Sequence, residues 1–193
     1  MNILGLALTA SLILMTNGAL TDNMKEALSR DVLWVKYRSY IRTNWGKSVN
    51  CEYFSLAKSK KQDQYIIKRS YNLAGQWKNE LLTGYVSKAG TECPGSVLEL
   101  MSSVIQTHER YCLVYWNSKE RCAVMKPTRN ECEMFVGNKA TGTPISNCTE
   151  AYDRLCGSGK YDVYDNACLP FWKQQEEQAA RKQGPYMKGE RYY

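Results

Sequence analysis

Eight cysteines constrain this 193-residue chain more than any other feature. Six of them fall between positions 112 and 168, separated by short aromatic and aliphatic runs. Cysteines at this density are typical of a disulfide framework in an extracellular protein. The even number predicts four bridges, formed by Cys51, Cys93, Cys112, Cys122, Cys132, Cys148, Cys156 and Cys168.

The N-terminus points to the same compartment. Residues 1–19 form an uncharged apolar run that ends in Asn-Gly-Ala, a pattern typical of a cleavable secretory signal peptide. A membrane-spanning helix is the alternative, but the run is shorter than the roughly 20 apolar residues that a span needs, and polar residues interrupt it. We therefore expect a secreted, extracellular protein.

The remaining chain predicts an all-β domain over residues 20–168 and a polar C-terminal tail over 169–193. Runs of β-branched and aromatic residues alternate with turn-forming residues, which indicates an antiparallel barrel or a sandwich. The expected strands are 32–41, 51–57, 65–71, 81–86, 97–106, 112–116, 122–125 and 132–136. Short helices are expected at 24–30, at 149–156 with Ser146 or Asn147 as the cap, and at 173–183.

The sequence does not indicate an enzyme. The single histidine, His108, lies in a polar stretch and is expected at the surface, so a nucleophilic Ser-His or Cys-His pair has one poor candidate base. Cysteines about ten residues apart in a secreted chain favour disulfides over zinc, so we expect no metal and no cofactor. Glu131 and Glu133 can share one strand face, but nothing else marks a glycosidase cleft.

The cysteine-rich stretch resembles the tick salivary lipocalins, the family that includes the histamine-binding proteins. The resemblance rests on Cys112 at the head of a late strand, on Glu-Met-Phe at 133–135, on the spacing from Cys148 to the closing Tyr-Asp-Val-Tyr-Asp-Asn-Ala-Cys, and on Trp45-Gly46 six residues before Cys51. It implies an eight-stranded antiparallel lipocalin barrel, whose interior is filled or holds one small ligand.

The resemblance also implies pairings for the cysteines. Cys51 is expected to pair with Cys168, and Cys112 with Cys148. The pairing of the other four stays open, with Cys132 to Cys156 and Cys93 to Cys122 preferred.

Sequestration of a small host mediator is the function that the resemblance implies: a biogenic amine such as histamine or serotonin, or a lipid such as a fatty acid or leukotriene. Glu133 matches the family's site carboxylate, beside Phe135, and Trp45 matches its tryptophan. Ser39, Arg42 and Met101 stand where the family has tyrosine, aspartate and phenylalanine. An ammonium would pair with Glu133, whereas a lipid carboxylate would favour Arg42.

Strand alternation places Arg42 on one face with Lys36 and Arg38, which would turn it to solvent unless a bulge intervenes. The net charge of +7 indicates acidic partners, and it fits a second class of function, an inhibitor that binds host complement or another defence protein through the barrel surface. We expect a monomer without nucleic-acid or membrane partners. Asn147-Cys148-Thr149 is a glycosylation sequon, which makes Asn147 the expected glycan site.

Overall fold

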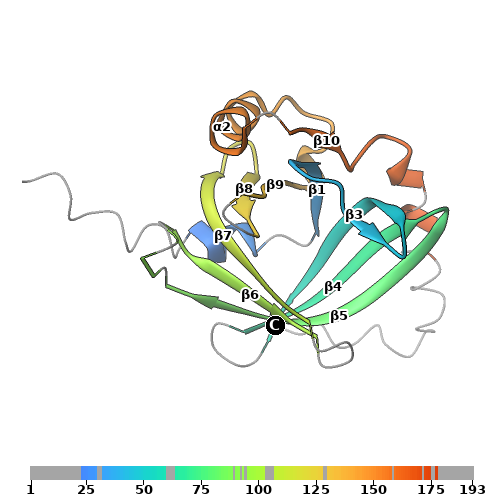
Figure 1. Cartoon of the computed structure of the whole chain (residues 1–193), viewed down its shortest axis with the longest axis horizontal. Coiled ribbons are helices and arrows are strands. Elements are labelled where there is room, and N and C mark those ends of the chain that lie inside the picture. Colours follow the sequence, from blue (N-terminus) through green and yellow to red (C-terminus); the bar gives the residue numbers. More distant parts are fainter. Residues whose placement is uncertain are drawn as a thin grey trace, which may run out of the picture.

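The computed structural model of the protein describes residues 23–29, 32–59, 64–88, 90–91, 93, 95–102, 107–127, 130–157, 159–170, 172–174 and 177. Within these ranges, eight antiparallel strands form a barrel (Figure 1). They are β1 (Val32–Arg38), β3 (Lys47–Lys58), β4 (Gln64–Leu73), β5 (Gln76–Ser87), β6 (Val97–Met101), β7 (His108–Asn117), β8 (Cys122–Lys126) and β9 (Glu133–Gly137). Two short strands, β2 (Thr43–Asn44) and β10 (Tyr161–Asp162), pair at the margins.

The barrel closes through β1, which pairs with β3 on one side and with β9 on the other. From β3 to β9, each strand pairs with its neighbour in sequence. The structure therefore confirms the predicted eight-stranded antiparallel barrel, in which closure pairs the edges that an open sheet would expose. The first strand ends at Arg38 rather than at 41, and most of the predicted end of β6, residues 103–106, lies outside the described residues.

The two ends of the barrel interior differ in polarity. Residues 23–27 are helical and cover one end, where Met24 and Leu28 join a buried core with Leu33 and Phe135. We call this the closed end. The opposite end holds charged side chains and is called the open end.

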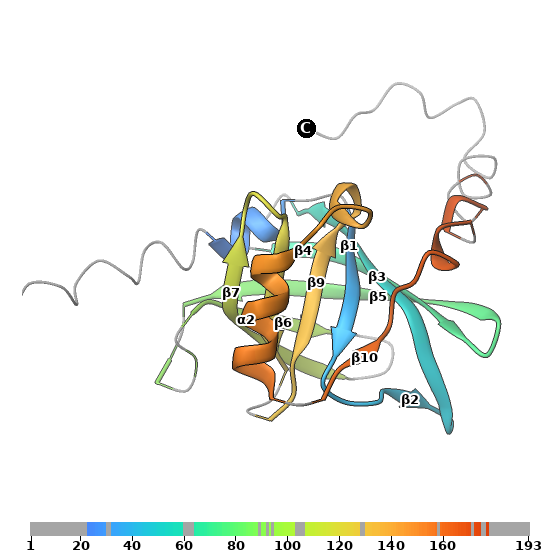
Figure 2. The ribbon, with the colours of Figure 1, turned by 90° about the horizontal axis from the view of Figure 1, so that it is seen from above.

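Helix α2 (Ser146–Cys156) lies outside the barrel against β7 and β8, and its buried cluster also includes residues of β9 (Figure 2). Its Cys148 and Tyr152 are buried against Val124 and Met134, which point outward from the barrel. The C-terminal helix of the expected fold is therefore confirmed, although it starts earlier than residue 149.

The start of α2 corrects the predicted cap. Ile145 occupies the N-cap position without a side-chain hydrogen bond, so neither Ser146 nor Asn147 has that role. The carboxylate of Glu120, in the β7–β8 turn, instead accepts hydrogen bonds from the backbone nitrogens of Asn147 (3.1 Å) and Cys148 (2.9 Å). A carboxylate from elsewhere in the chain thus satisfies donors that a helix start leaves unpaired.

Four disulfides cross-link the protein, and two of them correct the expected pairings. Cys51 joins Cys168 and Cys132 joins Cys156, as expected. Cys112 joins Cys93 rather than Cys148, because the β6–β7 pairing sets Cys112 opposite Val97, just after the loop that carries Cys93. Cys122 joins Cys148 rather than Cys93, because Cys122 is buried in the cluster between β8 and α2.

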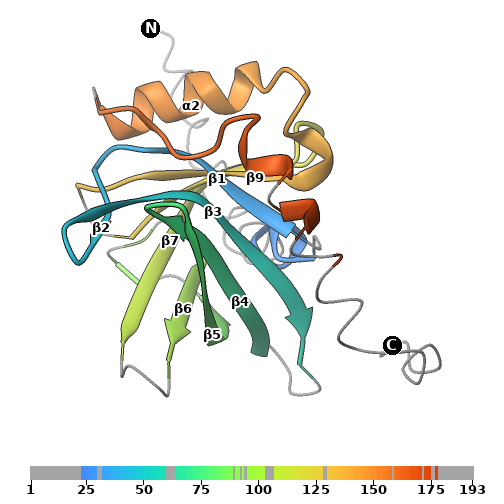
Figure 3. The same ribbon diagram turned by 90° about the vertical axis from the view of Figure 1, so that its right-hand side faces the viewer.

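The segment that follows α2 covers a second outer surface of the barrel, over β1 and β3 (Figure 3). Trp34 packs there against Tyr53, Tyr164 and Trp172, with ring centroids 4.8 to 6.2 Å apart. Residues 172–174 are helical, and most of the predicted tail helix at 173–183 lies outside the described residues. Within the part of the chain that the structure describes, no helix has the length and apolar character needed to cross a membrane.

Candidate ligand-binding site

The open end of the barrel is lined by charged side chains that share the inward face of apolar residues. Three strands repeat one pattern, in which a glutamate stands two residues before a buried aromatic residue: Glu52 and Phe54, Glu109 and Tyr111, Glu133 and Phe135. Side chains two residues apart on a strand lie on the same face, so each carboxylate points into the barrel with its aromatic neighbour. The three rings contact one another, with centroids 5.4 to 6.5 Å apart, and bring the three carboxylates over one aromatic floor.

A β-bulge in β1 turns Arg38 into this region. The register of β1 against β9 shifts between Val35 and Tyr37, which inverts the alternation that the sequence predicts. Tyr37 then packs outward against Tyr152 of α2, while Arg38 is 1% exposed inside the barrel, directly opposite Glu133. Arg38 therefore does not share a face with Lys36, and the bulge is the exception that the strand alternation left open.

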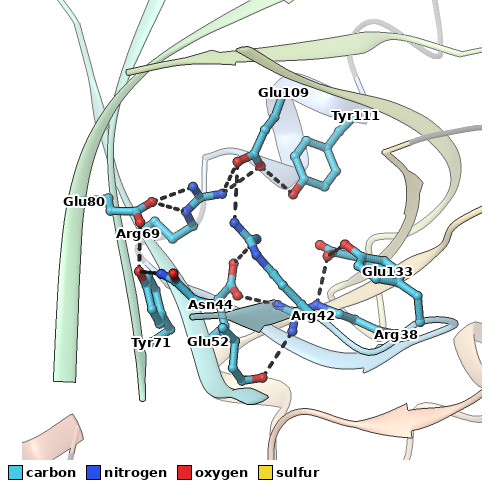
Figure 4. Close-up of polar contacts among 12 residues, drawn as sticks. Arg38, Arg42, Asn44, Glu52, Arg69, Tyr71, Glu80, Glu109, Tyr111 and Glu133 are labelled. Carbon is cyan, nitrogen blue, oxygen red and sulfur yellow. Dashed lines mark hydrogen bonds and ion pairs between the residues drawn. The ribbon is translucent and has the colours of Figure 1, made fainter. Parts of the chain in front are cut away.

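The ionised groups form one continuous series of contacts, which we call the charge series (Figure 4). Carboxylates and guanidinium groups alternate along it in the order Glu133, Arg38, Glu52, Arg42, Glu109, Arg69 and Glu80. Four carboxylates and three guanidinium groups give the charge series a formal net charge of one negative charge.

The buried members of the charge series stay ionised because each one contacts groups of opposite charge. Burial acts to raise the pKa of Glu52, but the guanidinium groups of Arg38 and Arg42 outweigh it and lower that pKa. Burial likewise acts to lower the pKa of Arg38, but Glu52 and Glu133 raise it above its ordinary value. Glu52 and Arg38 therefore both stay ionised at neutral pH, even though they are 0% and 1% exposed.

Glu133 ends the charge series with one oxygen that has no partner. Its Oε1 accepts hydrogen bonds from Arg38 Nε (2.9 Å) and from the hydroxyl of Tyr40. Burial and the Glu133 carboxylate raise the pKa of Tyr40, so this hydroxyl stays protonated and donates. Oε2 of Glu133 is buried and accepts no hydrogen bond within the described structure. Buried polar atoms normally have a hydrogen-bond partner, so this oxygen keeps an acceptor position that no described donor fills.

The structure brings together three of the six predicted ligand-binding residues. Glu133, Phe135 and Arg42 face the same part of the interior. Trp45 is 92% exposed at the tip of the β2–β3 hairpin, and Met101 is 40% exposed at the end of β6. Both lie outside the charge series.

Ser39 has a supporting position instead of a site position. Its Oγ accepts a hydrogen bond from the backbone nitrogen of Cys132 (2.8 Å), and its own nitrogen donates to the Cys132 carbonyl (3.0 Å). These bonds tie the end of β1 to the residue before Glu133, which keeps Arg38 and Glu133 side by side.

Five members of the charge series were not predicted from the sequence as site residues: Arg38, Glu52, Arg69, Glu80 and Glu109. A signal was present on four strands. Each of Glu52, Arg69, Glu80 and Glu109 stands two residues from a buried apolar residue, so the strand pattern itself places it inward. Only Arg38 needed the bulge.

A metal site is not supported among the described residues. Glu120, Cys122 and Cys148 are the one group there whose possible ligand atoms lie within 4.8 Å of one another. Cys122 and Cys148 share a disulfide, so they offer no thiolate. His108 is 59% exposed and lies 3.9 Å from Glu99 on the barrel surface.

The closed eight-stranded antiparallel barrel, with a helix packed on its outside, has the lipocalin fold. The chain belongs to the tick histamine-binding protein family, because the model described as "Tick histamine binding protein" matches residues 16–170. This is a family of binding proteins, so membership makes the chain a binding protein and not an enzyme.

Solved structures with the same fold share little sequence with the chain. The serotonin complex of AM182 is 12% identical with a TM-score of 0.54, covering 75% of this chain and 91% of AM182. Japanin from Rhipicephalus appendiculatus, bound to cholesterol, is 15% identical with a TM-score of 0.53, covering 74% of this chain and 98% of Japanin. Lobster apocrustacyanin A1 is 11% identical with a TM-score of 0.56, covering 83% of this chain and 92% of its own. Sequence comparison with curated proteins gives no match.

Proposed function

We propose that the protein is a secreted carrier that sequesters one small organic cation, a biogenic monoamine, inside the open end of its barrel. The observation that carries this proposal is Glu133 Oε2, a buried carboxylate oxygen without a hydrogen-bond donor. An ammonium group that leaves water needs a counter-charge and hydrogen-bond acceptors. The net negative charge of the charge series supplies the counter-charge, and Glu133 Oε2 supplies a hydrogen-bond acceptor. The neighbouring rings of Phe135 and Tyr111 suit the aromatic ring of a monoamine.

The charge series favours a cation over a lipid carboxylate. Arg42, the candidate partner for a fatty acid, already contacts Glu52 (3.1 Å) and Glu109 (3.5 Å). Arg38 and Arg69 likewise contact two carboxylates each. An anion would therefore enter a region that is already negative, whereas an ammonium would neutralise it.

The setting of the protein supports the same role. Four disulfides are typical of an oxidising, extracellular compartment, in agreement with the predicted signal peptide. AM182, which has the same fold, is solved with serotonin, and Japanin is solved with cholesterol, so proteins with this fold bind small organic molecules, one of which is an amine. Withholding such a mediator from the host would suppress inflammation.

One observation favours the second candidate function, inhibition of a host defence protein through the barrel surface. Trp45 is 92% exposed and has a positive φ of 52° at a hairpin tip, and Ile41, just before β2, is 59% exposed. Asn or Gly suits such a turn better than a bulky aromatic residue. Trp45 therefore contributes nothing evident to the fold, and it is free to contact a partner.

Calorimetric titration tests the proposed carrier function. Wild-type protein should bind serotonin or histamine with one equivalent and should not bind arachidonate. Glu133→Gln should weaken amine binding by about 10- to 150-fold, the effect of losing a charge-assisted hydrogen bond of roughly 1.5 to 3 kcal/mol. Glu99→Gln is the matched control, because it removes the same charge from a partly exposed position on β6. The proposal would be overturned, in favour of the surface function, if both variants lost the same amine affinity or if wild-type protein bound no amine.

A further inference from the structure

Arg42 differs from the other two arginines of the charge series. Arg38 and Arg69 are 1% exposed and extend from barrel strands, whereas Arg42 is 23% exposed and extends from the connection between β1 and β2. Its guanidinium group therefore reaches the interior from the open end, on the side that a dissolved ligand would also use.

The two carboxylates that hold Arg42 do not depend on it for their position. Glu52 also contacts Arg38, and Glu109 also accepts hydrogen bonds from Arg69 Nη1 at 2.7 and 2.8 Å. The contact between Arg42 and Glu109 is the longest of the charge series, at 3.5 Å. Tyr111 donates its hydroxyl to Glu109 (3.2 Å) and helps to fix that carboxylate. Glu52 and Glu109 are thus preorganised by other residues, on rigid strands.

From this geometry we infer that Arg42 occupies a second cation-binding position, formed by Glu52 and Glu109, and that it limits the barrel to one organic cation. The side chain acts as a tethered ligand of its own protein. A dissolved ammonium or guanidinium must compete with a cation whose local concentration is set by the short tether, and tethering gives effective concentrations in the millimolar range. The second charge of a diamine would meet Arg42 at close range and be repelled. Arg42 is therefore a specificity-determining residue that selects organic cations with a single charge. The identity of the natural ligand rests on the proposed function, whereas the cation position formed by Glu52 and Glu109 does not.

Removing the arginine should expose the position that it fills. Arg42→Ala changes the net charge of the charge series from one negative charge to two, and it leaves Glu52 and Glu109 with their other partners. The ligand class for the vacated position is a small guanidinium or primary amine. Glu109 and Arg42 are 26% and 23% exposed, so solvent reaches the position on the side of Glu109, while Glu52 on its inner side is buried.

The test uses methylguanidinium, which mimics the end of the arginine side chain and is independent of any natural ligand. Arg42→Ala should bind one equivalent of methylguanidinium at least about tenfold more tightly than wild type, because a charge-assisted bond becomes available. It should also show a methylguanidinium-dependent rise in Tm and gain affinity for putrescine, a diamine. Two controls should behave like wild type: Arg42→Lys, which keeps a cation, and Arg110→Ala, which removes an exposed charge from β7.

The outcomes separate the inference from the proposed function. Methylguanidinium binding by Arg42→Ala no tighter than by Arg110→Ala would overturn the inference, whatever wild-type protein does with serotonin. If Arg42→Ala is recovered unfolded, refolding in methylguanidinium chloride against equal sodium chloride tests the same position. Recovery only with methylguanidinium supports the cation site, and equal yields overturn it. Serotonin titration of wild type, run alongside, tests the carrier function by itself.

Discussion

Replacement of Arg38 by methionine should destabilise the fold more than any surface substitution, because Arg38 is the buried link between two carboxylates. Its guanidinium contacts Glu133 and Glu52, which are both 0% exposed, and donates to the carbonyl oxygen of Val49 at 3.3 Å. In Arg38→Met, Glu52 keeps Arg42, but Glu133 keeps only the hydroxyl of Tyr40. Breaking a buried ion pair on one side costs about 3 to 5 kcal/mol of unfolding free energy, since an uncompensated charge remains.

The assay is urea unfolding at pH 7 with the disulfides intact, followed by near-UV circular dichroism. Lys36→Met is the control, because it removes a cation from the outer side of the same strand, where Lys36 donates to the Tyr164 carbonyl at 3.2 Å. One exposed or half-exposed contact is worth about 1 kcal/mol. The double variant Arg38→Met with Glu133→Gln should recover part of the lost unfolding free energy, because it also removes the Glu133 charge that Arg38→Met leaves without a counter-charge.

The pH dependence gives a second check on the same variant. A buried carboxylate without a counter-charge prefers its neutral form, so folded Arg38→Met should bind a proton that the unfolded chain has released. The unfolding free energy of Arg38→Met should then increase as the pH falls from 7 to 5, so that the difference from wild type becomes smaller. Two results would refute this reasoning. One is a loss of unfolding free energy in Arg38→Met below about 1 kcal/mol, equal to the loss in Lys36→Met, and the other is a difference in stability between Arg38→Met and wild type that does not change with pH.

Two further predictions concern acid stability and modification. Because the pKa of Glu52 is lowered in the fold, its stabilisation is fully present above the unfolded value of about 4.3 and is lost as the pH falls through the native value. Glu52→Gln should therefore be less stable than wild type at pH 7 and approach it below about pH 4 in urea titrations; a constant gap would contradict this. We also expect one glycan on Asn147, which is exposed in the first turn of α2, so glycosidase treatment should increase the gel mobility of secreted wild type and not of Asn147→Gln. Identical mobility before and after treatment would exclude the glycan.

Strand positions followed from the sequence because local alternation and turn residues decide them. The strand predicted at 122–125 matches β8 (Cys122–Lys126), and the one at 65–71 lies inside β4. The cysteine pairing depended on which loops the barrel brings together. Cys93 reaches Cys112 only because β6 and β7 are neighbours, a contact that no local pattern specifies.

The site was harder to predict because its side chains break the usual rule for strands. Glu109 precedes Tyr111 on an inward face, but a charged residue beside apolar ones normally indicates the solvent side. Arg38 required a bulge, which depends on how β1 pairs with β9 and not on its own residues. Glu133 was proposed from a family pattern and not from strand periodicity, and the structure places it inside the barrel.

Helix α2 is fastened at both of its ends. Cys148 in its first turn is linked to Cys122 at the start of β8, and Cys156 at its last residue is linked to Cys132 just before β9. The helix therefore runs from the closed end to the open end along the wall that carries Glu133, and a disulfide fixes it to that wall at each end. Among the disulfides described, none joins β4 or β5 to a neighbouring strand. The barrel thus has one wall that disulfides cross-link to a helix, and one wall, formed by β4 and β5, that strand pairing and side-chain contacts such as Arg69–Glu80 hold together without a disulfide.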